Sequence, residues 1–245
     1  TKVLEYLAAG VLPVLNETSD HVELLGQDYP LFTNGSTTAE QLAIIIKDAI
    51  PGLDKTFNSV QTIPRGYSFT AASRHLAQSF QRARVLDARD QSDPQVKLAI
   101  ASHDLKFMAE VVDELHADPR FDLRIDHWSS LHDNDARASK EILDWADVIL
   151  CEWAGPNLEW YSNRVHDGQR LIARLHGFEL RGPWLRNVNL SRVDHIIYVS
   201  DFWRTKAKSA GLGDVASSVI PNMIDVSDLR RTKWPWARKH IGVAG

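Results

Sequence analysis

The sequence contains almost no cysteine: Cys151 is alone among 245 residues. One thiol excludes a disulfide framework and a metal site built from several cysteines. A single cysteine suits a protein of a reducing compartment. Long apolar runs are also lacking, since none would cross a bilayer, and no stretch has the form of a secretory signal. We therefore expect a cytoplasmic protein.

An excess of one charge is lacking as well. The 28 lysines and arginines nearly balance the 32 aspartates and glutamates, which gives a formal net charge of -4. This balance provides no electrostatic reason to expect a nucleic-acid partner. The glycine-rich motifs G-x-G-x-x-G and Walker A are also absent. Their absence disfavours dehydrogenases, kinases and Rossmann-type epimerases.

What the sequence does have is an ordinary globular composition, 44% hydrophobic and 24% charged, and a regular alternation of short apolar runs with amphipathic segments. In the first part, we expect helices at 1–9, 21–25, 37–50 and 68–84 and strands at 11–15 and 30–32. Gly10 is expected just past the end of the first helix. For the helix at 37–50, we expect Ser36 or Thr37 as the N-cap and a capping box between Thr37 and Glu40.

The stretch LDARDQSDPQV is polar, charged and interrupted by a proline, which is typical of a linker. A fresh series of elements follows it. We expect strands at 97–102, 121–128, 147–153, 170–176, 195–200, 217–222 and 239–245. Helices are expected between them, at 107–116, 133–145 and 156–166 among other places. This alternation indicates βαβ units and hence a parallel sheet with helices on both faces.

A family resemblance rests first on the opening stretch TKVLEYLAAGVLPV. It resembles the Lys-x-x-Glu-Tyr-x-Ala-x-Gly-x-Pro-Val pattern in the C-terminal half of GT-B glycosyltransferases of the family-four type. The matching positions are Lys2, Glu5, Tyr6, Ala8, Gly10, Pro13 and Val14, with one extra residue before the proline. The later stretch YSFTAASRHL is similar to the closing helix of the same half-domain.

The second part of the chain resembles the N-terminal, acceptor-binding half of the same fold. ADVILCEW, RLHG, VDHIIYVSDFW and VIPNMID follow one another in the order that the family shows. KHIGVAG then resembles the first strand of a further nucleotide-binding domain. The resemblance implies a fragment that joins the tail of one transferase module to the front of a second.

This resemblance implies the following domain organisation. Residues 1–86 are expected to form a partial nucleotide-sugar-binding half-domain, followed by a linker at 87–96. Residues 97–226 are expected to form a Rossmann-like acceptor domain. Residues 227–245 would be an interdomain linker and the first strand of a truncated domain.

The implied activity is transfer of a sugar, with retention, from a nucleotide-sugar to a glycan or lipid-linked acceptor, with neither a cofactor nor a metal. By resemblance, Glu5 would bind the ribose diol of the nucleotide. Thr1 and Lys2 lie at the start of the same helix, where free N–H groups and the helix dipole favour a diphosphate. A simpler alternative is that Glu5 and Lys2 lie on the solvent face of an ordinary amphipathic helix.

Candidate residues for the acceptor side follow the expected strands, where ligands bind in such sheets. His176 ends one strand, and the resemblance implies that it faces the cleft, where it would position the acceptor hydroxyl or share its proton. A histidine that merely ends a strand is the alternative. Glu179 and Arg181 follow in the same loop. His103 and Asp104 replace the glycine-rich acceptor loop that the family usually has.

Two other patterns have competing interpretations. Asp133-Asn134-Asp135 has the spacing of an Asp-x-Asp metal motif, but acidic residues at a helix start are common caps, which we prefer. The stretch RRTKWPWARKH and the segment 202–208 combine tryptophan or phenylalanine with cations. Such clusters suit peripheral contact with the inner face of a membrane, although cations of this kind are commoner in ordinary linkers.

One alternative of a different class remains for the whole chain. A fragment that contains half of each of two clefts would bind a nucleotide or glycan without catalysing transfer.

Overall fold

The computed structural model describes residues 2–82, 95–224 and 242–243. The chain divides into two compact units: Thr1–Ala72 together with Asn222–Gly245, and Ser73–Pro221. Most of the expected linker at 87–96 lies outside the described residues. None of the helices in the described ranges is long and apolar enough to cross a membrane.

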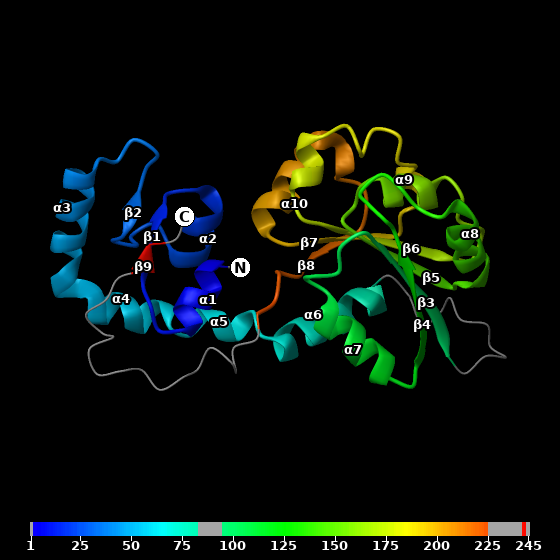
Figure 1. Ribbon diagram of the computed structural model, residues 1–245, viewed down its shortest axis with the longest axis horizontal. Coiled ribbons are helices and arrows are strands. Elements are labelled where there is room, and N and C mark those ends of the chain that lie inside the picture. Colours follow the sequence, from blue (N-terminus) through cyan, green and yellow to red (C-terminus); the bar gives the residue numbers. More distant parts are fainter. Residues whose placement is uncertain (1, 83–94, 225–241, 244–245) are drawn as a thin grey trace. The chain divides into compact units, whose positions relative to one another are not determined.

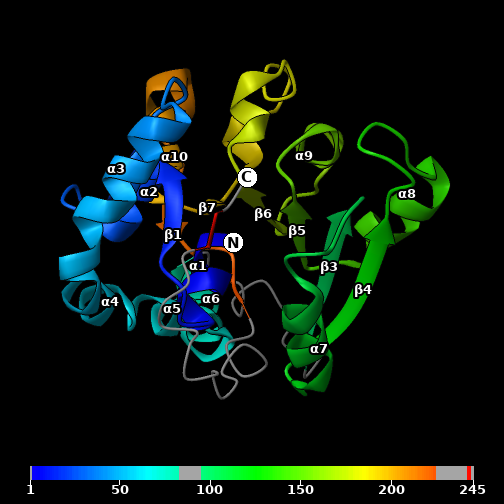
Figure 2. The same cartoon turned by 60° about the vertical axis from the view of Figure 1, so that its left-hand side comes forward.

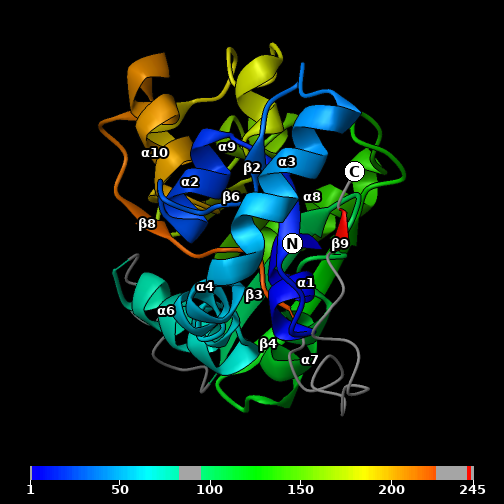
Figure 3. The same ribbon diagram turned by 90° about the vertical axis from the view of Figure 1, so that its left-hand side faces the viewer.

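The first unit contains a small parallel sheet in the order β2-β1-β9 (Figure 1), together with several helices (Figure 3). Its elements are α1 (Lys2–Ala8), β1 (Pro13–Asn16), α2 (Ser19–Leu25), β2 (Phe32–Thr33), α3 (Ala39–Ala49), η1 (Ile50–Gly52), α4 (Leu53–Val60), α5 (Ile63–Gly66) and β9 (Gly242–Val243). α6 (Phe69–Arg82) runs across the boundary between the two residue ranges. Thus the last expected strand is present in part, and it pairs with β1.

The core of this unit follows the predicted apolar stripe. Val3, Leu4 and Leu7 of α1 are buried, and Gly10 takes a positive φ of 73° where the helix ends. A left-handed residue at this position suits glycine, which has no Cβ to clash. Leu31 is fully buried in the same cluster.

The predicted cap of the third helix is wrong by one residue. α3 begins after Thr38, whose hydroxyl accepts from the backbone N–H of Gln41 while the Gln41 side chain accepts from the Thr38 N–H. The Thr37 hydroxyl is instead bound to Asn34 in the preceding turn. The capping box is therefore Thr38–Gln41 and not Thr37–Glu40.

The second unit is an α/β structure built on a six-stranded sheet (Figure 1). Its elements are β3 (Val96–Ser102), α7 (Ala109–Ala117), β4 (Phe121–His127), α8 (Ala136–Trp145), β5 (Val148–Glu152), α9 (Pro156–Ser162), β6 (Arg170–Leu175), η3 (Phe178–Arg181), η4 (Leu190–Arg192), β7 (His195–Tyr198), α10 (Asp201–Ala207), η5 (Lys208–Leu212) and β8 (Ser217–Val219). The expected α/β class with a parallel sheet is confirmed for this unit.

All pairs in this sheet are parallel, and the strand order is β4-β3-β5-β6-β7-β8 (Figure 2). Helices α8, α9 and α10 lie on one face, and α7 lies on the other with the end of α6 (Figure 1). The chain builds outward from β3 first to β4 and then, in the other direction, to β5. The point between β3 and β5 is therefore the topological switch point of the sheet, where α/β folds bind ligands.

The central strands are buried on both faces, which explains their unbroken apolar sequence. Leu98 and Ile100 of β3 and Ile149 and Leu150 of β5 have no exposed surface. At one end of the unit, the Ser79 hydroxyl of α6 lies 2.7 Å from the Ser218 hydroxyl of β8 in a buried hydrogen bond. The end of α6 is thereby fixed to the last strand of the sheet.

Candidate functional site

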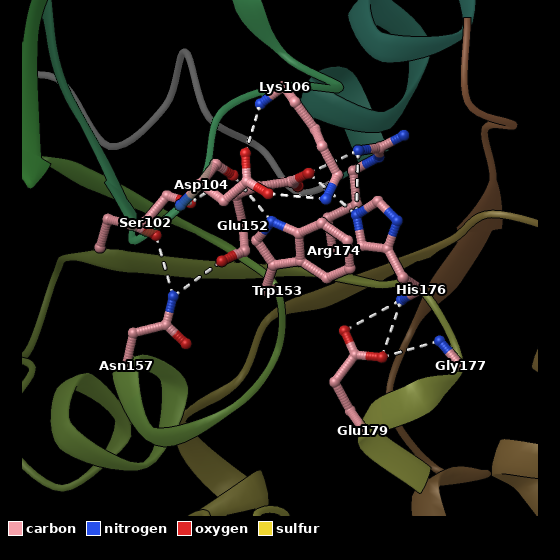
Figure 4. A network of polar contacts seen from close by, with 11 residues as sticks. Ser102, Asp104, Lys106, Glu152, Trp153, Asn157, Arg174, His176, Gly177 and Glu179 are labelled. Atoms are coloured by element: carbon pink, nitrogen blue, oxygen red, sulfur yellow. Dashed lines mark hydrogen bonds and ion pairs between the residues drawn. The ribbon is translucent and has the colours of Figure 1, made fainter. Parts of the chain in front are cut away.

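The candidate site lies at the carboxyl ends of β3, β5 and β6, beside the switch point (Figure 4). In a parallel sheet these ends share one edge, so the residues that follow them converge. Two charged side chains are placed there by register, because Glu152 at the end of β5 is paired with Arg174 of β6. His176 follows immediately after β6.

Glu152, Arg174 and His176 form a buried polar cluster. The Glu152 Oε1 atom is 2.7 Å from Arg174 Nη1 and 2.9 Å from His176 Nε2. Arg174 Nη1 and His176 Nε2 are 3.2 Å apart. The exposed fractions of the Glu152, Arg174 and His176 side chains are 0%, 3% and 5%. Charges so deeply buried are stable only when they are paired and hydrogen-bonded, as they are here.

Trp153 forms one wall of this cluster, and its backbone is unusual. It has a φ of 61°, the one positive value among the non-glycine residues in the described ranges. A bulky residue in this region is strained, and such strain concentrates at functional sites. The Trp153 ring stacks on His176 with centroids 3.9 Å apart, and its Nε1 donates to the Asp104 carbonyl oxygen at 2.7 Å.

More aromatic rings surround the imidazole. Phe107 stacks on His176 with centroids 5.3 Å apart, while His103 and Phe178 lie within 6.0 Å of Trp153. The two nearly parallel stacks hold the plane of the His176 ring. Its orientation is thus determined by packing as well as by the Glu152 contact.

The loop after β3 adds charge beside these rings. Lys106 Nζ lies 2.8 Å from Asp104 Oδ2 and 5.1 Å from the Trp153 ring. Burial by itself would raise the pKa of Asp104, but the hydrogen bonds and charge of Lys106 outweigh it and lower that pKa. Burial lowers the pKa of His103, which favours its neutral form. His103 and Asp104, expected near the acceptor, therefore lie beside the cluster that contains His176.

Asn157 fixes the two strand ends on either side of the switch point. Its Nδ2 donates to the Ala101 carbonyl of β3 at 2.9 Å and to the Glu152 carbonyl of β5 at 2.8 Å. Its Oδ1 accepts from the Gly155 N–H. These buried bonds hold the edge of the sheet in one shape.

Glu179 supports the site from below the histidine. Its carboxylate accepts from the backbone N–H groups of His176 and Gly177 at 2.7–3.1 Å. Burial raises the pKa of Glu179, although these N–H groups act in the opposite direction. Glu179 contacts the backbone of the loop and not the His176 ring, so it holds the loop in place.

Arg181, the remaining acceptor-side candidate, is exposed, and its guanidinium lies 5.5 Å from the Trp203 ring centroid. Trp203 in turn lies against the Gly177 backbone, where a Cβ would come within 2.3 Å of the indole. The structure therefore groups Arg181 with α10 and gives it no contact with the Glu152 cluster.

The donor-side candidates belong to the first unit. Lys2 and Glu5 are exposed on α1, as the interpretation of a solvent-facing helix also predicts. Thr1 lies outside the described residues. Their expected role in binding a nucleotide stays a prediction.

The segment Asp133-Asn134-Asp135 has capping geometry. Asp135 accepts from the N–H groups of Arg137 and Ala138 at the start of α8. Asp133 accepts from Ser129, and Asn134 donates to Ser139. Within the described ranges, no group of three or more histidine, cysteine or acidic side chains has the arrangement of a metal site.

Of the two basic aromatic clusters, RRTKWPWARKH lies outside the described residues. In the other, Lys206 Nζ lies 5.6 Å from the Phe202 ring, and Arg204 pairs with Asp201. Cations over aromatic rings fit either interpretation of this cluster.

Sequence reasoning missed Glu152, Arg174 and Trp153. A signal was present, because Glu152 ends an apolar strand and Arg174 interrupts the apolar run of the next strand. Such a residue is almost never fully buried unless it is paired. The pairing itself follows from the register of β5 on β6, which the sequence does not state.

No family model, curated protein or solved structure matches this chain in comparisons with all three. The resemblance to GT-B glycosyltransferases therefore stays a prediction.

Proposed function

We propose that this chain belongs to a glycosyltransferase of GT-B type that moves a sugar from a nucleotide-sugar to a glycan or lipid-linked acceptor. The observation that supports the proposal is the Glu152–Arg174–His176 cluster beside the switch point of the second unit. A histidine with a carboxylate partner at this edge is suited to acid–base work on a bound hydroxyl.

In the proposed reaction, the acceptor O–H bond breaks and a new bond forms between that oxygen and the anomeric carbon. The bond from the anomeric carbon to the phosphate oxygen breaks, and the nucleoside diphosphate leaves with the electron pair. His176 takes or shares the acceptor proton. Glu5 on α1 belongs to the first unit, and the family resemblance implies that it binds the ribose diol in the separate donor site of the preceding module.

The first experiment measures binding of UDP, GDP, ADP and dTDP to the whole chain by calorimetry. We expect at least one of them to bind, and Glu5→Ala to weaken that binding about tenfold or more, since hydrogen bonds to charged groups contribute roughly 1.5–3 kcal/mol. Asp54→Ala is the matched control, because Asp54 is an exposed carboxylate on α4 of the same unit. Equal affinity in wild type and Glu5→Ala would remove Glu5 from the site.

The second experiment follows release of the nucleoside diphosphate from a panel of UDP- and GDP-sugars in the presence of glycan acceptors. We expect His176→Ala to lower turnover on the order of 10²–10⁴-fold, the usual contribution of an acid–base group. Binding of a nucleotide without any turnover by the wild type would favour a non-catalytic binding module. Absence of both binding and turnover would exclude the transferase.

A further inference from the structure

We propose that Glu152 is a positioning residue that holds the His176 imidazole in one tautomer, with the proton on Nε2 and with Nδ1 as the nitrogen that accepts a proton. This inference rests on the proposed function for its catalytic meaning. The tautomer itself is a property of the chain without substrate.

The Glu152 and His176 side chains are in direct contact. Glu152 Oε1 and His176 Nε2 are 2.9 Å apart, which is a hydrogen-bond distance. An ionised carboxylate has no proton to donate, so the hydrogen of this bond must belong to Nε2. In a neutral imidazole the other nitrogen, Nδ1, is then the acceptor.

Arg174 contacts both Glu152 and His176. Its Nη1 lies 2.7 Å from Glu152 Oε1 and 3.2 Å from His176 Nε2. A guanidinium only donates, so a bond to Nε2 would require a bare nitrogen there. The shorter contact goes to the carboxylate, and a bond between opposite charges is the stronger one. Arg174 thus bonds to the Glu152 carboxylate and leaves Nε2 to carry its proton.

Packing also holds the plane of the imidazole. Trp153 lies against it at a centroid distance of 3.9 Å and Phe107 at 5.3 Å, both within 25° of parallel. The backbone N–H of His176 is held by Glu179. Ring plane and backbone are therefore fixed independently of the Glu152 contact.

The arrangement also differs from a simple buried ion pair. Arginine and carboxylate commonly pair through two parallel bonds. Here Arg174 Nη1 and His176 Nε2 both contact Oε1, while Oε2 is buried without a hydrogen-bond partner among the described residues. Glu152 Oε1 therefore contacts the arginine and the histidine at once, as expected of a carboxylate that positions the imidazole.

The test uses the whole chain with ¹⁵N-labelled histidine and no ligand. Spectra are recorded at a pH about two units above roughly 6.5, the ordinary pKa of histidine. Long-range ¹H–¹⁵N correlation spectra distinguish the protonated ring nitrogen from the bare one, and His176→Gln assigns the signals. We expect His176 to show the Nε2–H tautomer alone. An Nδ1–H form or an even mixture in the wild type would overturn the inference without any variant.

Glu152→Gln then tests the cause. Its carboxamide both donates and accepts, so we expect His176 to become a mixture of tautomers. Glu179→Gln is the matched control, because it removes a carboxylate that contacts the His176 backbone and not its ring. An unchanged tautomer in a folded Glu152→Gln protein would also overturn the inference.

Activity separates this inference from the proposed function. With UDP-glucose, or whichever nucleotide-sugar the wild type turns over, we expect Glu152→Gln to lower kcat with little change in donor KM. Combining it with His176→Gln should add no further loss, because the two residues act as a unit. If turnover depends on His176 while the tautomer is Nδ1–H, the inference fails and the transferase stands. The expected tautomer with no turnover of any nucleotide-sugar would instead refute the transferase and the catalytic meaning of the tautomer together.

Discussion

Gly177 supports the histidine loop in a way that a single methyl group would disrupt. Its φ is 104°, and a Cβ built there would lie 2.3 Å from the Trp203 indole. Gly177→Ala therefore introduces two costs at once, an unfavourable backbone conformation and a steric clash. We expect it to be among the most destabilising single-methyl substitutions in the second unit.

Two other glycines of the same unit separate these costs. Gly168 has a φ of 93° but nothing within 4 Å of its Cβ position, so Gly168→Ala should cost only the backbone strain, about 1–2 kcal/mol. Gly182 lacks a positive φ but has the Trp184 ring at 2.2 Å, so Gly182→Ala should cost about 1–3 kcal/mol for overpacking. The sum predicts about 2–5 kcal/mol for Gly177→Ala.

Urea unfolding followed by tryptophan fluorescence and far-ultraviolet circular dichroism measures these values, with the midpoint and slope compared across the three variants. The Gly177→Ala loss should exceed each of the other two. A loss no larger than that of Gly168→Ala would mean that Trp203 does not pack on Gly177, and the geometry described for this loop would be refuted.

Two further predictions concern charges at the same edge of the sheet. Arg174→Met should lower the free energy of unfolding by about 3–5 kcal/mol because it leaves the buried Glu152 carboxylate without its arginine partner, whereas Glu152→Leu combined with Arg174→Met should regain most of that loss. Urea titration of both variants checks this, and an equal or greater loss in the double variant would contradict it. Because burial raises the pKa of Glu179, the folded state binds more protons than the unfolded state from about pH 4 upward, so stability should fall as pH rises through this window. Unfolding across pH 4–7 should show that fall in wild type and not in Glu179→Gln, and parallel curves would argue against it.

The parallel sheet of the second unit could be predicted because each central strand is apolar on both faces. Runs such as KLAIAS and DVILC have no polar face to confuse with a helix, and they alternate with amphipathic segments. The first unit was harder to predict. Pro51 follows the helix expected at 37–50, but it lies in the short 3-10 turn η1, after which α4 begins. A proline at the start of a helical turn loses no hydrogen bond there, so the chain continues in helices.

The candidate site could be predicted only where a residue's position along the chain decides its place. His176, His103 and Asp104 follow strands, and the rule that strand ends meet at one edge brings them together. The partner of His176 is different, because Glu152 reaches it through the pairing of β5 with β6. The left-handed backbone of Trp153 has no sequence signal either, because tryptophan rarely adopts this conformation.

The buried hydrogen bond between Ser79 and Ser218 joins the beginning of the second unit to its last strand. The first and last segments of this unit therefore lie close together. A domain whose two ends meet can be inserted into another chain, because it leaves the path of the host residues almost unchanged. The second unit thus has the topology of an insertable domain. New loops could arise on its sheet during evolution without changing the path of the segments before and after it.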